Sequence, residues 1–137
     1  MADVADVEPA MTPVKFPLMR REVMVALAGL ADRDYQQRVW LEQKYPHPMY
    51  FDDLTLTINV LFDDCQILPD PMTRIGTILV EEDDELSHLH LLGRCLSELI
   101  SDLGEAPDSD YLADARWESV CRNAALALAA MVRVWAM

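Results

Sequence analysis

The chain has 137 residues and a mass of 15.6 kDa, enough for one domain with its own core and too short for two enzyme-sized domains. Its composition is 52% hydrophobic and 26% charged, with four Gly and eight Pro, which excludes a disordered, collagen-like or low-complexity chain. The formal net charge of −13, from 24 acidic and 11 basic residues, argues against nucleic acid or an anionic membrane surface as a partner.

The N-terminus and the cysteines bear on the compartment. Three of the first eight residues are acidic, where a secretory leader would be basic, and the longest apolar stretch, 124–132, is about half the length that a bilayer requires. Cys65, Cys95 and Cys121 are odd in number and contain no CxxC pair. We therefore expect a cytoplasmic protein with no membrane span, no zinc site and reduced, mostly buried thiols.

The first predicted helix follows an N-terminal arm. Residues 1–16 contain two prolines and no periodicity, so we expect a flexible arm ahead of a single helical domain, 17–137. Pro17 suits a first helical turn. Apolar residues then recur at helical spacing, namely Leu18, Val23, Ala26, Leu27 and Leu30.

A second helix is predicted over about 33–44. Asp32 can cap its N-terminus, and the Tyr45-Pro46-His47-Pro48 turn must end it, because prolines lack the N–H donor that a helix requires. Residues 50–65 then fit either the alternation of a strand or one helical face. We predict a helix there, because Asp52-Asp53 suits a helix N-terminus and no comparable partner strand exists.

The C-terminal half contains the clearest helical signal. Residues 75–80 are short and apolar and fit either strand or helix. A leucine stripe from Leu86 to Leu103 ends at Gly104, which is typical of the residue after a helix. A short helical turn near Tyr111 then leads into a long helix over 115–135 that is apolar on every side between 124 and 132. We predict an all-α fold, a compact bundle of five or six helices around a buried C-terminal helix.

The net charge is concentrated in the middle of the chain. Residues 51–110 hold fifteen acidic and two basic residues. One interpretation is a solvated surface with acids at helix N-termini. The other is an electrostatic docking surface for a basic protein. The candidate partner-binding residues, expected on one acidic face, are Asp52, Asp53, Asp63, Asp64, Glu81, Glu82, Asp83, Asp84 and Glu85.

No catalytic or metal-binding motif is present in the sequence. The adjacent acidic pairs would point about 100° apart on a helix, which suits capping better than paired acid and base catalysis. His88 and His90 would point to nearly opposite sides of their helix, and Asp84 with His88 lacks a third ligand. No P-loop, G-x-G-x-x-G, G-x-S-x-G or H-E-x-x-H occurs. We therefore expect no catalytic residue, no metal and no cofactor.

Several motifs occur together: Tyr35-Gln36-Gln37-Arg38-Val39-Trp40, the Tyr45-Pro46-His47-Pro48 turn, Asp52-Asp53, Leu61-Phe62-Asp63-Asp64, Ile75-Gly76, and Tyr111-Leu112-Ala113 with Trp117. As a set they resemble a family of small bacterial single-domain proteins of unknown function, over roughly residues 18–130. In size, acidity and helical character the chain is also similar to immunity proteins of contact-dependent growth inhibition systems, small cytoplasmic partners of a toxin domain. That likeness implies a kind of partner and no site residues.

Two classes of function follow. The first is an acidic binding protein, an immunity protein that neutralises a basic toxin domain, such as a nuclease, whose own surface must be positive to hold phosphates. The alternative is a helical enzyme or metal-binding bundle in which Asp63, Asp64, Asp84 and His88 converge. A homodimer joined by exposed helix faces stays open beside both.

Overall fold

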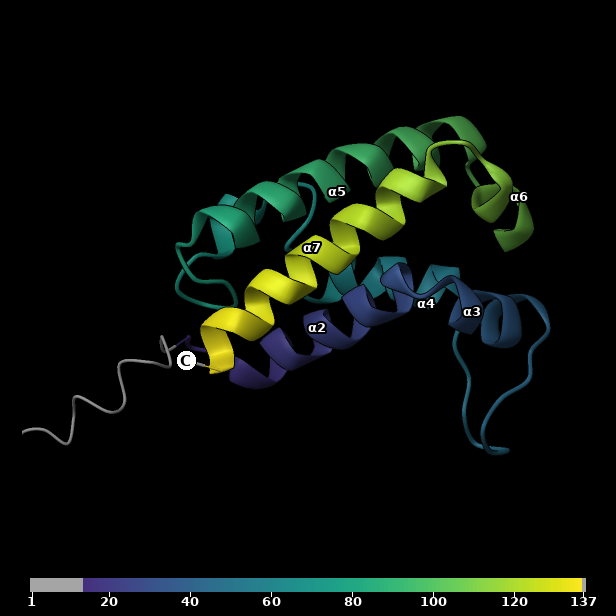
Figure 1. Ribbon diagram of the computed structural model, residues 1–137, viewed down its shortest axis with the longest axis horizontal. Coiled ribbons are helices and arrows are strands. Elements are labelled where there is room, and N and C mark those ends of the chain that lie inside the picture. Colours follow the sequence, from purple (N-terminus) through teal and green to yellow (C-terminus); the bar gives the residue numbers. More distant parts are fainter. Residues whose placement is uncertain (1–13, 137) are drawn as a thin grey trace, which may run out of the picture.

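The computed structural model describes residues 14–136, and within them the chain is helical with no strand. Residues 14–136 contain six α-helices, and three π-helical or 3₁₀-helical segments join or extend them (Figure 1). In chain order the elements are α2 (Pro17–Ala31), α3 (Arg33–Tyr35), η2 (Gln36–Leu41), α4 (Leu54–Asn59), η3 (Val60–Asp64), η4 (Pro71–Arg74), α5 (Asp83–Leu103), α6 (Asp108–Ala113) and α7 (Trp117–Ala136). The predicted all-α class is confirmed.

The C-terminal helix α7 packs against both α5 and α2, as expected of the central helix of the bundle (Figure 1). The core between these three helices consists of aliphatic side chains and the fully buried Trp117. The outer side of α7 is open, because Leu126 and Val132 are 42% and 46% exposed. Two long helices, rather than a complete ring, therefore cover α7.

Side chains identified in the sequence cap several helices. Pro17 begins α2, and Asp32 accepts a hydrogen bond from the Tyr35 backbone N–H at 3.0 Å. Glu82 caps α5 by accepting from two backbone N–H groups, and Gly104 follows α5 with φ of +54°, a conformation that favours glycine. The helix predicted over 33–44 is present but ends at Leu41.

The two segments that fit either strand or helix in the sequence, 50–65 and 75–80, adopt different structures. The helix predicted within 50–65 is confirmed as α4 and η3, with Asp53 accepting from the Leu56 backbone N–H at 2.8 Å. Residues 75–80 form neither a strand nor a helix, but a turn closed by an isolated bridge between Ile75 and Leu79. Residues 1–13 of the predicted arm lie outside the described residues, and the backbone N–H groups of residues 15 and 16 bond to carbonyls of 76 and 77.

Two of the helical turns are π-helical, with hydrogen bonds that span five residues instead of four. In η2 the Glu42 backbone N–H donates to the Gln37 carbonyl at 3.0 Å, and after η3 the Cys65 N–H donates to the Val60 carbonyl at 2.9 Å. Both segments lie directly after a regular helix, α3 and α4, so each adds one wide turn to its end.

A buried ion pair joins α2 to the start of α5. The Arg20 guanidinium donates to both carboxylate oxygens of Glu85, at 2.7 and 2.8 Å, and the two side chains are 1% and 0% exposed. Arg20 also donates to the Ile78 carbonyl, and Glu85 accepts from the Val80 backbone N–H. The pair therefore also holds the 75–80 turn against the bundle.

Candidate binding groove

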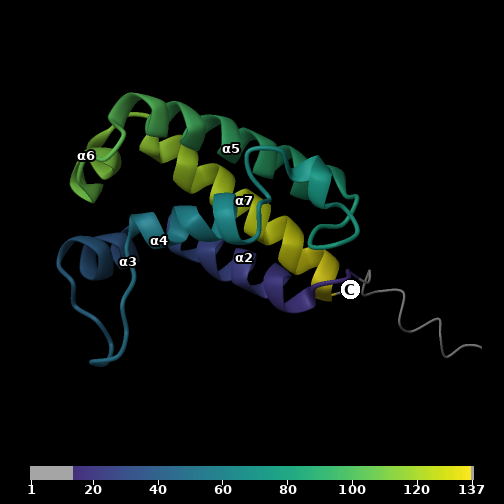
Figure 2. The same ribbon diagram turned by 180° about the vertical axis from the view of Figure 1, so that it is seen from behind.

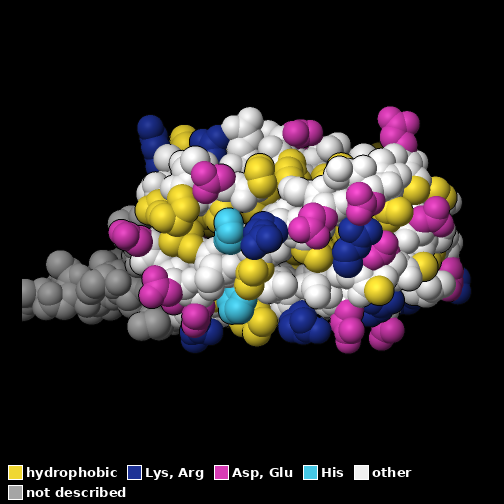
Figure 3. Space-filling view, turned by 90° about the horizontal axis from the view of Figure 1, so that it is seen from above, with side chains coloured by type: hydrophobic (Ala, Val, Ile, Leu, Met, Phe, Trp, Pro, Cys, Tyr) yellow, Lys and Arg dark blue, Asp and Glu magenta, His cyan; other side chains and the backbone are white. Residues whose placement is uncertain are grey.

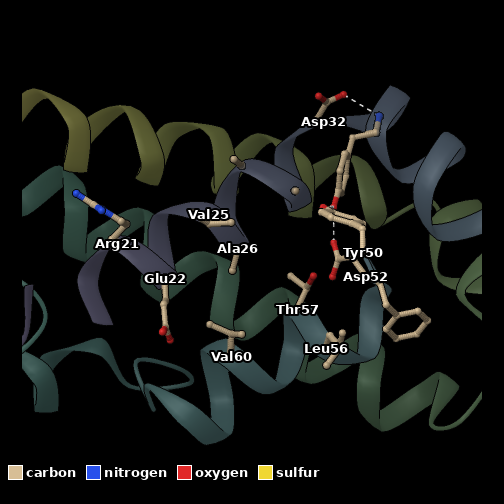
Figure 4. Close-up of a pocket in the computed structure, with 14 residues that line it drawn as sticks. Arg21, Glu22, Val25, Ala26, Asp32, Tyr50, Asp52, Leu56, Thr57 and Val60 are labelled. Atoms are coloured by element: carbon tan, nitrogen blue, oxygen red, sulfur yellow. Dashed lines mark hydrogen bonds between the residues drawn. The ribbon is translucent and has the colours of Figure 1, made fainter. Parts of the chain in front are cut away.

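A groove of about 590 Å³ runs along the outer side of α2, between this helix and α4 with η3 (Figure 4). We call it the α2–α4 groove; its lining residues are Arg21, Glu22, Val25, Ala26, Ala28, Gly29, Asp32, Tyr35, Tyr50, Phe51, Asp52, Leu56, Thr57 and Val60. The small residues of α2 leave the space, because a longer side chain at Ala28 or Gly29 would occupy it. Figure 4 shows Val25 and Ala26 on one side and Leu56, Thr57 and Val60 on the other.

The walls of the groove are mostly apolar and partly exposed. Val25 is 66% exposed, Phe51 57% and Leu56 42%, and they come from α2, the 45–53 loop and α4 in turn. Acidic side chains accompany them, since Glu22, Asp32 and Asp52 also line the groove, with Arg21 as its basic residue. An apolar centre with a charged rim is the usual layout of a protein-binding surface.

A hydrogen-bond network closes one end of the groove. One carboxylate oxygen of Asp52 accepts from the Tyr35 hydroxyl at 2.6 Å and from the Trp40 indole N–H at 3.0 Å, and the Tyr50 and Tyr35 hydroxyls also bond to each other. Burial, and then the hydrogen bond to Asp52, raises the pKa of Tyr35 well above its ordinary value. Asp52 therefore fixes the 45–53 loop to α3 and η2.

The predicted acidic residues have different environments. Asp53 caps α4, while Asp63 and Asp64 are exposed at the end of η3. The negative charges of Asp64 and of Glu22 in the groove lining both raise the pKa of the Cys65 thiol, after the larger effect of burial. At the start of α5, Glu81 and Asp83 are exposed, Glu82 is the cap, and Asp84 pairs with Arg133 at 3.0 Å.

The burial of Glu85 corrects the predicted acidic face. Its side chain is fully buried against Arg20, so it contributes nothing to an exposed surface. An acid in the first turn of a helix suits both a solvated position and a buried ion pair, and the partner that decides between them is 65 residues away in the chain.

The remaining acids are spread along the length of the molecule and do not form one cluster. Asp52 bonds Trp40, whose ring packs against Trp117 with centroids 6.4 Å apart, at the start of α7. Asp84 pairs with Arg133, sixteen residues further along α7, about 24 Å away at 1.5 Å per residue. Accordingly, α4 and α5 begin at opposite ends of the long axis (Figure 2), and the face in Figure 3 mixes acidic, basic and apolar side chains.

The residues of the alternative hypothesis, a helical enzyme or metal-binding bundle, do not come together in the structure. Among residues 14–136 no group of three His, Cys, Asp or Glu side chains is placed to hold a metal ion, so Asp63, Asp64, Asp84 and His88 do not converge. The thiols are not activated nucleophiles, because burial raises the pKa of Cys65 to about 11 and also raises those of Cys95 and Cys121. No described helix is long and apolar enough to cross a bilayer.

Sequence reasoning missed the apolar residues of the groove. Val25 was an available signal, because it lies between Glu22 and Ala28 on the outer side of α2, where a solvated helix would carry a polar residue. Phe51 and Leu56 gave no such signal, since both fit an amphipathic pattern whose orientation depends on the fold.

Comparisons with known proteins identify a family. A family model described as "Domain of unknown function (DUF7945)" matches residues 14–134, close to the span expected from the motifs. No curated protein and no solved structure matches the chain. The chain therefore belongs to the DUF7945 family, whose function is not known.

Proposed function

We propose that this protein is a binding module that docks a basic partner protein at the α2–α4 groove. The observation that carries the proposal is the set of exposed apolar side chains in the groove, Val25, Phe51 and Leu56, beside the acidic rim of Glu22 and Asp32. Apolar side chains in a hollow are what a partner buries, and the acids around them select its charge.

The energetics favour a partner chosen by charge. Burying the exposed part of each of the three apolar side chains contributes on the order of 1 kcal/mol, before the cost of association is subtracted. The formal net charge of −13 adds long-range attraction to a basic protein, which raises the association rate and falls with salt. Attraction at a distance and apolar contact at the groove thus act in sequence.

We further propose that the partner is a toxin domain and that the protein acts as its immunity protein in the cytoplasm. This rests on the likeness in size, acidity and helical character together with the groove. A nuclease toxin needs a positive surface to hold phosphates, and an acidic module that covers this surface blocks substrate access. The acids outside the groove, Asp63, Asp64 and Glu81 to Asp84, would contribute to attraction at a distance.

The experiment is a pull-down from the native host with the tagged full chain, washed at low and then high salt. Val25→Arg places a positive charge in the groove, and Leu91→Arg is the matched control, because Leu91 is 45% exposed on α5 and does not line the groove. We expect a basic protein that high salt releases and that Val25→Arg, but not Leu91→Arg, fails to capture. Co-expression should then relieve the growth arrest caused by that protein.

Equal capture by the Val25→Arg and Leu91→Arg variants would show that the groove is not the docking site. A captured protein that salt does not release would contradict the role of charge. If the captured basic protein is not toxic, the immunity function is refuted, while the proposed role as a binding module stands.

A further inference from the structure

A second hollow lies on the other side of Phe51. It has a volume of about 390 Å³, and we call it the aromatic pocket after Trp40, Tyr45 and Phe51, which line it together with Asp53 and Asp108. Phe51 also lines the α2–α4 groove, so the two hollows share this side chain as a wall.

The aromatic rings stand at an angle to one another around the pocket. The Tyr45 and Phe51 rings meet edge to face, with centroids 5.8 Å apart and planes at 64°. Trp40 is held from behind, because its indole N–H donates to Asp52 and its ring packs against Trp117. Fixed aromatic faces around a hollow attract cations through the negative charge of the ring face.

Two carboxylates lie beside these rings and each has one oxygen to spare. Asp53 uses Oδ1 to accept from the Leu56 backbone N–H, and Asp108 uses Oδ2 to accept from the Leu54 N–H at 3.1 Å. Within residues 14–136 the second oxygen of each accepts no hydrogen bond. Helix α4 thus holds both carboxylates in position and leaves two acceptors for a ligand.

The negative charges of Asp53 and Asp108 repel each other. Burial, and then the nearby charges of Asp53 and Asp52, raise the pKa of Asp108, against the lowering effect of its hydrogen bond from Leu54. The charges that act on Asp108 therefore come from the 45–53 loop. The other polar residues of the lining are Gln43, Tyr45 and Ser109, and the described residues place no basic side chain there. A bound cation would relieve this repulsion.

We propose that the aromatic pocket binds an arginine side chain of the partner protein. A guanidinium group is planar, stacks on aromatic rings and donates several hydrogen bonds in fixed directions, which matches the partly exposed Tyr45 and Phe51 rings and two carboxylate oxygens. The proposal rests on the proposed function, because it names the part of the basic partner that is recognised. The shared Phe51 wall further requires that the arginine stand next to an apolar side chain that enters the groove.

The test uses the full chain and a small probe, so that it does not depend on finding the partner. N-acetyl-arginine methylamide is titrated into ¹⁵N-labelled protein, with N-acetyl-norleucine methylamide as the uncharged control. We expect saturable shifts of the Trp40 indole N–H and the Leu54 amide, with a Kd on the order of millimolar, and no saturation with norleucine. Tetramethylammonium, which lacks donors, should bind more weakly than the arginine probe.

Asp108→Asn tests the carboxylate, since its amide oxygen can still accept from Leu54 and keep the fold. It should weaken arginine binding about tenfold, while Asp110→Asn, the same charge change at an exposed position of α6 outside the pocket, should leave binding unchanged. Equal effects of the two variants, or equal binding of norleucine, would overturn the proposal.

The proposed docking groove and the proposed arginine pocket can be refuted independently of each other. Capture of a salt-sensitive basic partner that is lost with Val25→Arg and kept with Asp108→Asn would refute the arginine pocket and leave the groove. Saturable binding of the arginine probe, together with a partner that ignores Val25→Arg, would support the pocket and refute the groove.

Discussion

The buried pair of Arg20 and Glu85 allows a quantitative test of the packing described above. Glu85→Gln keeps the shape of the side chain and removes the negative charge that accepts two hydrogen bonds from the buried Arg20 guanidinium. Both side chains are at most 1% exposed, so solvent does not screen the change. Removing one partner of such a pair costs about 3–5 kcal/mol. For a chain of this length, total stability is about 7–20 kcal/mol, so a large share would be lost.

The double variant Arg20→Met, Glu85→Leu removes both charges and refills the space with apolar atoms. It still leaves the Ile78 carbonyl and the Val80 N–H without their partners. We expect it to cost about 2 kcal/mol, less than either single change, because apolar replacement of a buried ion pair is often neutral or stabilising. The coupling between the two sites would then exceed about 3 kcal/mol.

The assay is urea unfolding followed by circular dichroism. It compares the wild type and Glu85→Gln with the cycle of Arg20→Met, Glu85→Leu and the double variant, and the coupling is taken from that cycle. The exposed pair of Asp84 and Arg133, with side chains 60% and 55% exposed, is the control, and its loss should cost less than about 1 kcal/mol. If the double variant costs as much as the two single changes added together, the two charges do not depend on each other and the reasoning is wrong.

Three further predictions concern single residues. Gly93→Ala should lower the melting temperature, because the new Cβ would lie 3.1 Å from a loop carbonyl oxygen, whereas Gly29→Ala, whose nearest contact is 3.6 Å, should raise it through helix propensity. Hydrogen bonds from Arg116 lower the pKa of Asp114 to about 2, so the contribution of the ionised Asp114 to the stability of the fold is present above about pH 4 and lost toward pH 2. Arg116→Gln should raise the pKa of Asp114 measured in an NMR titration. Because the pKa of Tyr35 is raised, the contribution of its protonated hydroxyl to the stability of the fold is present below pH 10 and lost above it. An ultraviolet titration in which every tyrosine ionises together near pH 10 would contradict this prediction.

The helices were predictable because their signals are local. Capping residues such as Asp32 and Glu82, and apolar spacing along α5, act within a few residues of each other. The 75–80 turn was not predictable, because distant parts of the chain hold it in place. Arg20 donates to the Ile78 carbonyl, and the backbone N–H groups of residues 15 and 16 donate to the carbonyls of 76 and 77. A short apolar run reports burial without reporting which structure achieves it.

The candidate site was less predictable than the fold. The sequence shows how many acids each segment carries, but the distance between Asp52 and Asp84 depends on which helix ends meet in space. Likewise, Phe51 and Asp108 are 57 residues apart, and only the packing of α6 beside α4 brings them to one pocket.

The π-helical turns have a consequence for how the chain tolerates insertions and deletions. A π turn holds one more residue than an α turn, and each residue of a helix advances by about 100°. Deleting one residue of η2, such as Gln37, would therefore restore regular helix hydrogen bonds while rotating either Tyr35 or Trp40 away from Asp52. Regular backbone hydrogen bonding and the closed end of the groove are thus alternatives at this position, and the number of residues in η2 decides whether Tyr35 and Trp40 both reach Asp52.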